Sequence, residues 1–195
     1  MLRLFSVAVI CGALLHISPV NAASGSGEYA VKGVGLATCK MYLDEKEKAS
    51  NRYFQFVGWV IGYLSGHNRY GKDVTDIAPW QTTDLLAAFI GNYCKANPEE
   101  RLVAATNRMI GALHPTRLRN SSKRVEAKAG GKTVIIYEAI LRRAQQMLSE
   151  RGFYTGATDG KFGPAMERAI RKFQKDKKIG VTGLPDQRTL LILFR

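Results

Sequence analysis

Apolar residues recur at helical spacing along most of the chain, and polar or glycine-rich breaks separate the helical stretches. In the N-terminal half, Thr83-Asp84 and Asn97-Pro98 suit helix starts, because Thr, Asp and Asn cap helices and Pro fits the first helical position. The pattern therefore predicts a small all-α domain over residues 24–113. Its four helices are expected over residues 36–43, 46–63, 83–94 and 97–113.

Three glycines at and just beyond the end of the second predicted helix would share one helical face at intervals of four residues: Gly58, Gly62 and Gly66. Such a stripe can allow two helices to approach closely. A membrane dimer motif is the sharper alternative, but polar residues surround the stripe and no apolar span of about 20 residues contains it.

The C-terminal stretch, residues 134–195, repeats one arrangement of a helical pattern, a glycine-rich loop and another helical pattern. The first loop spans residues 152–164 and the second residues 179–186. Pro164 suits the start of the helix after the first loop, and Asp186 suits the cap of the last helix. We expect three helices here, so the predicted fold is all-α, with a disulfide-bonded four-helix domain and a three-helix domain. The first of the three is predicted from the spacing of Ile136, Ile140, Ala144, Met147 and Leu148.

The formal net charge of +13 is spread unevenly along the chain. Residues 114–133 hold six Lys or Arg residues against the single acid Glu126, with glycines and serines among them. Like charges repel one another and keep such a segment extended. We therefore predict a basic linker over residues 114–133. A passive tether and an electrostatic contact with an anionic polymer or surface both fit this charge.

The N-terminus has the features of a secretory signal peptide. Arg3 precedes an apolar run, and Pro19 and Val20-Asn21-Ala22 follow it, with small residues where a signal peptidase reads. We predict cleavage after Ala22, so residues 1–22 are the signal peptide and the mature protein is periplasmic or secreted. A membrane anchor is the alternative, but the run is shorter than the roughly 20 residues that span a bilayer. We expect no membrane span in the mature form.

Two cysteines, Cys39 and Cys94, remain once Cys11 is removed with the signal peptide. An isolated pair in an oxidising compartment most simply forms a disulfide. A bridge over 55 positions would contribute about 4 kcal/mol in the chain-entropy model. A reactive thiol or a metal pair is the alternative, but the cysteines have no ligand-type spacing with His67 or His114. We predict the disulfide and no metal site.

One set of motifs runs through the C-terminal loops and helices: Ala144-Gln145-Gln146-Met147-Leu148, Gly152-Phe153-Tyr154, Gly156, Asp159-Gly160-Lys161-Phe162-Gly163-Pro164, Ala169-Ile170, Phe173-Gln174, Val181-Thr182-Gly183-Leu184-Pro185-Asp186 and Thr189-Leu190. These motifs are similar to those of the peptidoglycan-binding domain found on many cell-wall hydrolases. The resemblance covers residues 134–195. It implies a three-helix domain that binds peptidoglycan.

Five side chains of this domain are candidates for contact with peptidoglycan. Tyr154 can stack on a sugar face. Lys161 and two arginines can pair with the carboxylates of stem peptides, and Arg can donate two parallel hydrogen bonds. A solvated surface without a ligand is the alternative for the charged residues. The candidates are Tyr154, Asp159, Lys161, Arg168 and Arg171.

A second resemblance covers residues 33–113. It depends on the aromatic, Gly and Asn-Pro positions within residues 59–68 and 93–101. These positions resemble those of the Tai-type immunity proteins of type VI secretion, whose shape is similar to that of HdeA-like acid chaperones. The resemblance implies a small disulfide-bonded helical protein of the periplasm. It also opens the alternative that this domain inhibits a cell-wall hydrolase.

No catalytic constellation is recognisable in the sequence. It has no His-Glu-x-x-His or Gly-x-Ser-x-Gly motif, and the spacing of the acids selects no carboxylate pair. We therefore predict a non-enzymatic protein without a cofactor, whose partners are peptidoglycan and a periplasmic protein such as a hydrolase, and not nucleic acid. Its predicted function is to anchor the helical domain at the cell wall. An accessory module of wall remodelling and a wall hydrolase with an unrecognised site are the alternatives.

Overall fold

The computed structural model describes residues 28–195 and is mostly helical. The predicted signal peptide lies outside the described residues. Residues 31–195 form one compact unit, and the boundaries that we expect between its domains remain predictions. Within the described range, no helix combines the length and the apolar character needed to cross a membrane.

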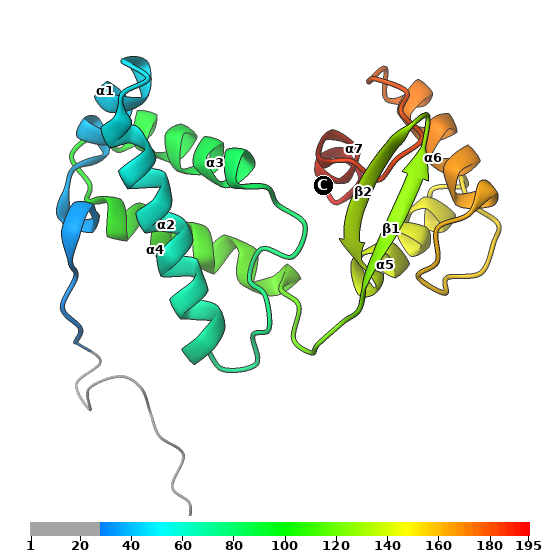
Figure 1. Cartoon of the computed structure of the whole chain (residues 1–195), viewed down its shortest axis with the longest axis horizontal. Helices are drawn as coiled ribbons and strands as arrows, with labels where there is room; N and C mark the ends of the chain where they lie inside the picture. Colours follow the sequence, from blue (N-terminus) through cyan, green and yellow to red (C-terminus); the bar gives the residue numbers. More distant parts are fainter. Residues whose placement is uncertain (1–27) are drawn as a thin grey trace, which may run out of the picture. The chain divides into compact units, whose positions relative to one another are not determined.

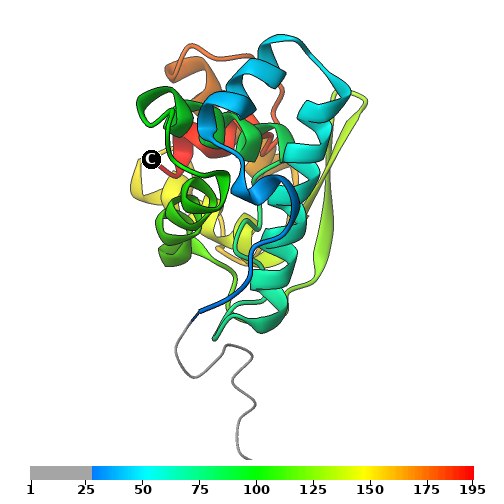
Figure 2. The same cartoon turned by 90° about the vertical axis from the view of Figure 1, so that its left-hand side faces the viewer.

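Four α-helices make up the first part of this unit (Figure 1 and Figure 2). Three of them begin at a Ser or Thr cap, because the side chains of Thr38, Ser50 and Thr82 accept hydrogen bonds from N–H groups of the first turn. The four α-helices are α1 (Cys39–Glu47), α2 (Asn51–Tyr70), α3 (Thr83–Ala96) and α4 (Leu102–Leu113). The 3₁₀ helix η1 (Gly33–Leu36) precedes them, and the 3₁₀ helix η2 (His114–Thr116) follows them.

The start of α4 differs from the prediction. Asn97 does not cap α4 but ends α3, where its N–H donates to the carbonyl of Cys94 at 3.2 Å. The carbonyl of Glu100 then accepts the N–H of Cys39 at 2.7 Å. The segment between α3 and α4 therefore holds the first residue of α1 in place, and α4 begins only at Leu102.

The predicted disulfide is present. Cys39 at the start of α1 is bonded to Cys94 near the end of α3, with the two Cα atoms 4.8 Å apart. Both cysteines are fully buried. The bond therefore joins two helices within one apolar core. That core also contains Tyr42, Phe56, Val60, Leu64, Ile77, Leu86, Ile90, Leu102, Ala105, Met109, Ile110 and Leu113.

The glycine stripe of α2 is not covered by another helix. A Cβ atom built at Gly58, Gly62 or Gly66 would meet no heavy atom within 4 Å outside the backbone of α2 itself. The close helix packing that such a stripe can allow is therefore absent from the described chain. The exposed rings of Phe54 and Tyr70 lie one helical turn before and after the stripe.

Replacing these glycines by alanine is expected to stabilise the protein. Ala is favoured over Gly in a helix interior by about 0.8–1 kcal/mol, and no contact opposes the new methyl groups. The variant Gly58→Ala/Gly62→Ala/Gly66→Ala should raise the free energy of unfolding by about 2.4–3 kcal/mol in urea denaturation. Gly35→Ala is the opposite control, because a Cβ there would overlap the side chain of Trp59. A triple variant less stable than the wild type would contradict the finding that no side chain covers these three glycines of α2.

A two-stranded antiparallel sheet, absent from the predicted all-α fold, precedes the C-terminal helices. Strand β1 (Arg124–Ala129) pairs with β2 (Lys132–Tyr137). Gly130 and Gly131 form the turn with φ angles of 55° and 73°, the positive values that tight two-residue hairpins require. The range predicted as a basic linker thus contains a strand, and Ile136, which we expected in a helix, lies in β2.

Three helices follow the hairpin: α5 (Glu138–Glu150), α6 (Pro164–Asp176) and α7 (Gln187–Leu193). Pro164 occupies the first turn of α6, and the side chain of Asp186 caps α7. Their apolar faces form a second core, which places the two glycine-rich loops at the ends of α5 and α6. This core contains Ile136, Ile140, Leu141, Ala144, Leu148, Tyr154, Met166, Ala169, Ile170, Phe173, Leu190 and Leu193.

The two cores touch through the segment between α2 and α3. Trp80 of this segment packs against the second core, with its ring centroid 5.4 Å from that of Phe194. The N–H of Thr82 also donates to the side-chain oxygen of Gln187 at 2.6 Å. These contacts fit the single compact unit over residues 31–195.

Candidate functional site

One buried glutamine fastens the first glycine-rich loop to α5. The amide nitrogen of Gln145 donates to the carboxylate of Asp159 at 3.1 Å and to the carbonyl of Lys161 at 2.9 Å. Its amide oxygen accepts the N–H of Gly160 at 2.7 Å. Gly160 has a φ angle of 75°, and a Cβ there would lie 2.8 Å from the carbonyl oxygen of Glu138. Glycine is therefore required at this position.

The second loop repeats the arrangement. The buried Gln174 of α6 accepts the N–H of Gly183 at 2.8 Å, and Gly183 has a φ angle of 74°. The amide nitrogen of Gln174 donates to the hydroxyl groups of Thr182 and Thr189 at 2.9 and 2.8 Å. The repeat noted in the sequence is thus one of structure, because a glutamine on the preceding helix holds a glycine of positive φ in each loop.

Two of the predicted binding residues support the loops. Asp159 accepts the N–H of Lys161 at 2.9 Å and the amide of Gln145, and these hydrogen bonds hold the pKa of Asp159 below its ordinary value. Arg171 forms an ion pair with Glu167 at 2.8 Å and donates to the carbonyl of Val181. The charged groups of Asp159 and Arg171 are therefore engaged within the domain.

Tyr154 is largely enclosed. It is 8% exposed, and its hydroxyl donates to the carbonyl of Ala157 at 3.0 Å. Its ring also lies against Gly156, where an added Cβ would overlap it. The ring is thus held by contacts within the loop, and its stacking on a sugar stays a prediction.

A pocket of about 180 Å³ lies between the first loop and α6. It brings together Tyr154 and Arg168 of the predicted set, whereas Lys161 is exposed on the loop. Lys172 adds a second positive charge that our sequence reasoning missed, although its spacing of four residues from Arg168 indicated a shared helix face. The lining residues are Phe153, Tyr154, Thr155, Gly156, Ala165, Arg168, Ala169 and Lys172.

The electrostatics of this pocket favour an anionic ligand. Arg168 and Lys172 are both exposed, and neither belongs to an ion pair in the part of the chain that the structure describes. Two such cations on adjacent helical turns can form charge-assisted hydrogen bonds with one carboxylate or with neighbouring ones. Among residues 28–195, no group of three or more His, Cys, Asp or Glu side chains is placed to hold a metal ion.

Two families match this chain. Residues 138–193 match the family described as "Putative peptidoglycan binding domain", and residues 6–104 match the family described as "HdeA/HdeB family". The matches confirm the resemblance to a peptidoglycan-binding domain in the C-terminal part of the chain and the resemblance to HdeA-like proteins in the N-terminal part.

Individual proteins match parts of the chain. The "Putative OxPP cycle protein OpcA" of Nostoc punctiforme (strain ATCC 29133 / PCC 73102) is 43% identical over 61 residues, which are 31% of this chain and 13% of that protein. The chain therefore spans only a small part of this relative. The crystal structure of the SleB N-terminal domain is 31% identical, with 38% of this chain and 92% of that chain covered and a TM-score of 0.29.

Proposed function

Because the chain belongs to the HdeA/HdeB family and its residues 138–193 match a peptidoglycan-binding domain, we propose that it is a periplasmic protein that anchors a small helical domain to the cell wall. In this proposal the C-terminal helices and loops bind peptidoglycan without cleaving it. The disulfide-bonded helices α1–α4 are then held at the wall. The bond between Cys39 and Cys94 supports an oxidising compartment.

The basic pocket beside α6 is the observation that carries the proposal. The stem peptides of peptidoglycan present carboxylates, and a guanidinium can bind a carboxylate through two parallel hydrogen bonds. We assign this contact to Arg168, with Lys172 as a second cation and Lys161 as an accessory one. Gln145 fixes the backbone of the adjoining loop, so little conformational entropy is lost on binding.

The variant Arg168→Gln/Lys172→Gln should bind purified sacculi about tenfold more weakly than the wild type, because two charge-assisted contacts are lost. Co-sedimentation at two salt concentrations measures this affinity, and the difference between variant and wild type should shrink at high salt. The wild-type incubation should release no soluble muropeptides above a buffer control.

The matched control removes the same charge elsewhere on the domain. Lys175 and Arg188 are exposed and lie outside the pocket lining, so Lys175→Gln/Arg188→Gln should retain nearly full affinity. Equal weakening in the two double variants would show diffuse attraction to an anionic polymer and would remove the pocket from the proposal. Wild-type protein that stays in the supernatant at both salt concentrations would refute wall binding itself.

A further inference from the structure

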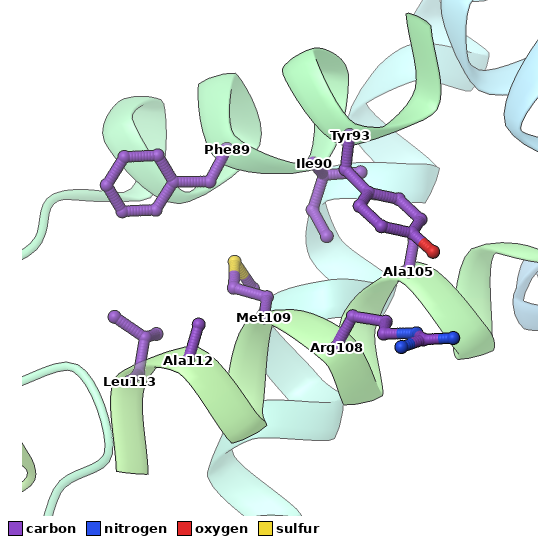
Figure 3. Close-up of a pocket in the computed structure, with 8 residues that line it drawn as sticks. All are labelled: Phe89, Ile90, Tyr93, Ala105, Arg108, Met109, Ala112 and Leu113. Carbon is purple, nitrogen blue, oxygen red and sulfur yellow. The ribbon is translucent and has the colours of Figure 1, made fainter. Parts of the chain in front are cut away.

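A groove of about 400 Å³ lies between α3 and α4, away from the basic pocket (Figure 3). Phe89, Ile90 and Tyr93 project into it from α3, and the residues of α4 face them. Figure 3 shows Phe89 and Leu113 at one end of the groove and Tyr93 with Arg108 at the other. The lining residues are Phe89, Ile90, Tyr93, Ala105, Arg108, Met109, Ala112 and Leu113.

The polar atoms of the groove are gathered at one end. Arg108 is its one charged lining residue, and Tyr93 supplies its one hydroxyl. That hydroxyl donates to the carboxylate of Glu100 at 2.8 Å. Arg108 is exposed and belongs to no ion pair within residues 28–195. The guanidinium of Arg108 also interacts with the Tyr93 hydroxyl. The groove is therefore an apolar channel whose mouth carries a cation that forms no ion pair in the described chain.

The dimensions favour a small molecule over a protein partner. A volume of about 400 Å³ falls in the range of small-molecule sites, which are mostly apolar with a few placed polar groups. Four lining residues are already more than nine-tenths buried, which leaves a narrow slot and not the roughly 800 Å² per partner of a stable protein interface. Those four residues are Ile90, Ala105, Met109 and Leu113.

We propose that this groove binds a free fatty acid, with the acyl chain between α3 and α4 and the carboxylate on Arg108. An uncharged hydrocarbon would leave the guanidinium unused, and a soluble organic acid would leave the apolar channel unfilled. A fatty acid fills the apolar channel and pairs with the guanidinium, since burial of each methylene group is favourable and the carboxylate gains charge-assisted hydrogen bonds. This site shares no residue with the pocket beside α6, so it does not depend on peptidoglycan binding.

Calorimetric titration of the full mature protein with dodecanoate, below its micelle concentration, tests the site. Arg108→Gln should weaken dodecanoate binding about tenfold, the scale of one lost charge-assisted hydrogen bond, and should leave dodecan-1-ol binding unchanged. Lys95→Gln is the matched control, because Lys95 is an exposed cation of α3 that does not line the groove. It should retain the wild-type affinity for both ligands.

A second variant tests the channel. Ala112 lines the groove and is exposed, so Ala112→Phe should narrow the site without disturbing the core and should weaken both ligands. An unchanged melting temperature would verify its fold. The proposal fails if dodecanoate does not bind, if Arg108→Gln and Lys95→Gln have equal effects, or if Ala112→Phe has none. It also fails if vesicles of phosphatidylglycerol bind the wild type and Ala112→Phe equally and compete with dodecanoate, because a lipid surface would then be the ligand.

Discussion

The variant Cys39→Ala/Cys94→Ala should have a free energy of unfolding about 2–5 kcal/mol lower than the wild type. The bond joins α1 to α3 across a sequence separation of 55 residues, so its loss releases a long loop in the unfolded chain. Alanine is preferred to serine as the replacement because both positions are fully buried, and an unpartnered hydroxyl there would add a cost of its own. Since small domains have total stabilities of about 5–15 kcal/mol, the loss is a large fraction of the stability.

Urea denaturation with and without dithiothreitol measures this effect. The reductant should lower the stability of the wild type to that of the variant and should not change the variant. Residues 134–195 contain no cysteine, so the folded variant should bind sacculi as the wild type does.

The result also tests the expected domain boundary. Because Trp80 packs against the second core, loosening of α1–α4 has a physical route to the C-terminal helices. Parallel loss of helical stability and sacculus binding would show that residues 31–195 unfold as one unit, and it would contradict two independently folding domains. An unchanged denaturation midpoint would show that the bond contributes nothing to stability.

Gly160→Ala should destabilise the C-terminal helices by about 2–5 kcal/mol, which adds the cost of a left-handed backbone to that of overpacking. The φ angle of Gly160 is 75°, and a new Cβ would lie 2.5 Å from Cγ and 2.8 Å from the carbonyl oxygen of Glu138. The carbonyl belongs to the first residue of α5 and cannot rotate aside. The loop must therefore move, and the hydrogen bond from Gly160 to Gln145 is lost with it.

Gly152→Ala separates the two contributions. Gly152 has the same φ angle of 75°, but a Cβ there would meet nothing within 4 Å. Its replacement should lower the free energy of unfolding by only about 1–2 kcal/mol, the cost of placing a residue with a Cβ in the left-handed conformation. Urea denaturation of both variants gives the difference, and binding to sacculi should fall in Gly160→Ala alone. Equal stabilities for the two variants would mean that the contact between the new Cβ and Glu138 does not destabilise the fold.

Much of the helical fold follows from local sequence signals. The disulfide and the helix start at Pro164 were predictable because few alternatives compete with an isolated cysteine pair or with proline in a first turn. The start of α4 was not predictable, because Asn97 suits a helix end as well as a helix start, and the choice depends on the distant N–H of Cys39. A capping residue therefore marks a nearby helix boundary, but it does not show whether the preceding helix ends there or the following helix begins there.

The hairpin was missed for a different reason. Ile136 and Ile140 fit helical spacing, and a short apolar run cannot by itself distinguish a strand from a helix. The better signal was Gly130-Gly131 between two six-residue stretches, since paired glycines suit the positive φ angles of a two-residue hairpin turn.

The conformation of the loop backbone at the candidate site was predictable from the sequence, but the partners of its charged side chains were not. Glycines needed for the loops are visible in the sequence, because few other residues adopt positive φ. The role of a charged side chain depends on which partner lies within reach after folding. Arg171 meets Glu167, whereas Arg168 on the same helix meets no acid in the described chain and faces the pocket with Lys172.

The contacts that hold the first loop have a consequence for how the domain can diversify. Tyr154 binds the carbonyl of Ala157, Arg142 binds that of Thr158, and Gln145 binds that of Lys161. All three anchors use main-chain oxygen atoms, which every amino acid supplies, and the side chains of these three loop residues are exposed. Substitutions there can alter what the loop recognises while the fold keeps the same anchors. Single substitutions at these loop positions can therefore change the binding specificity, each with little loss of stability.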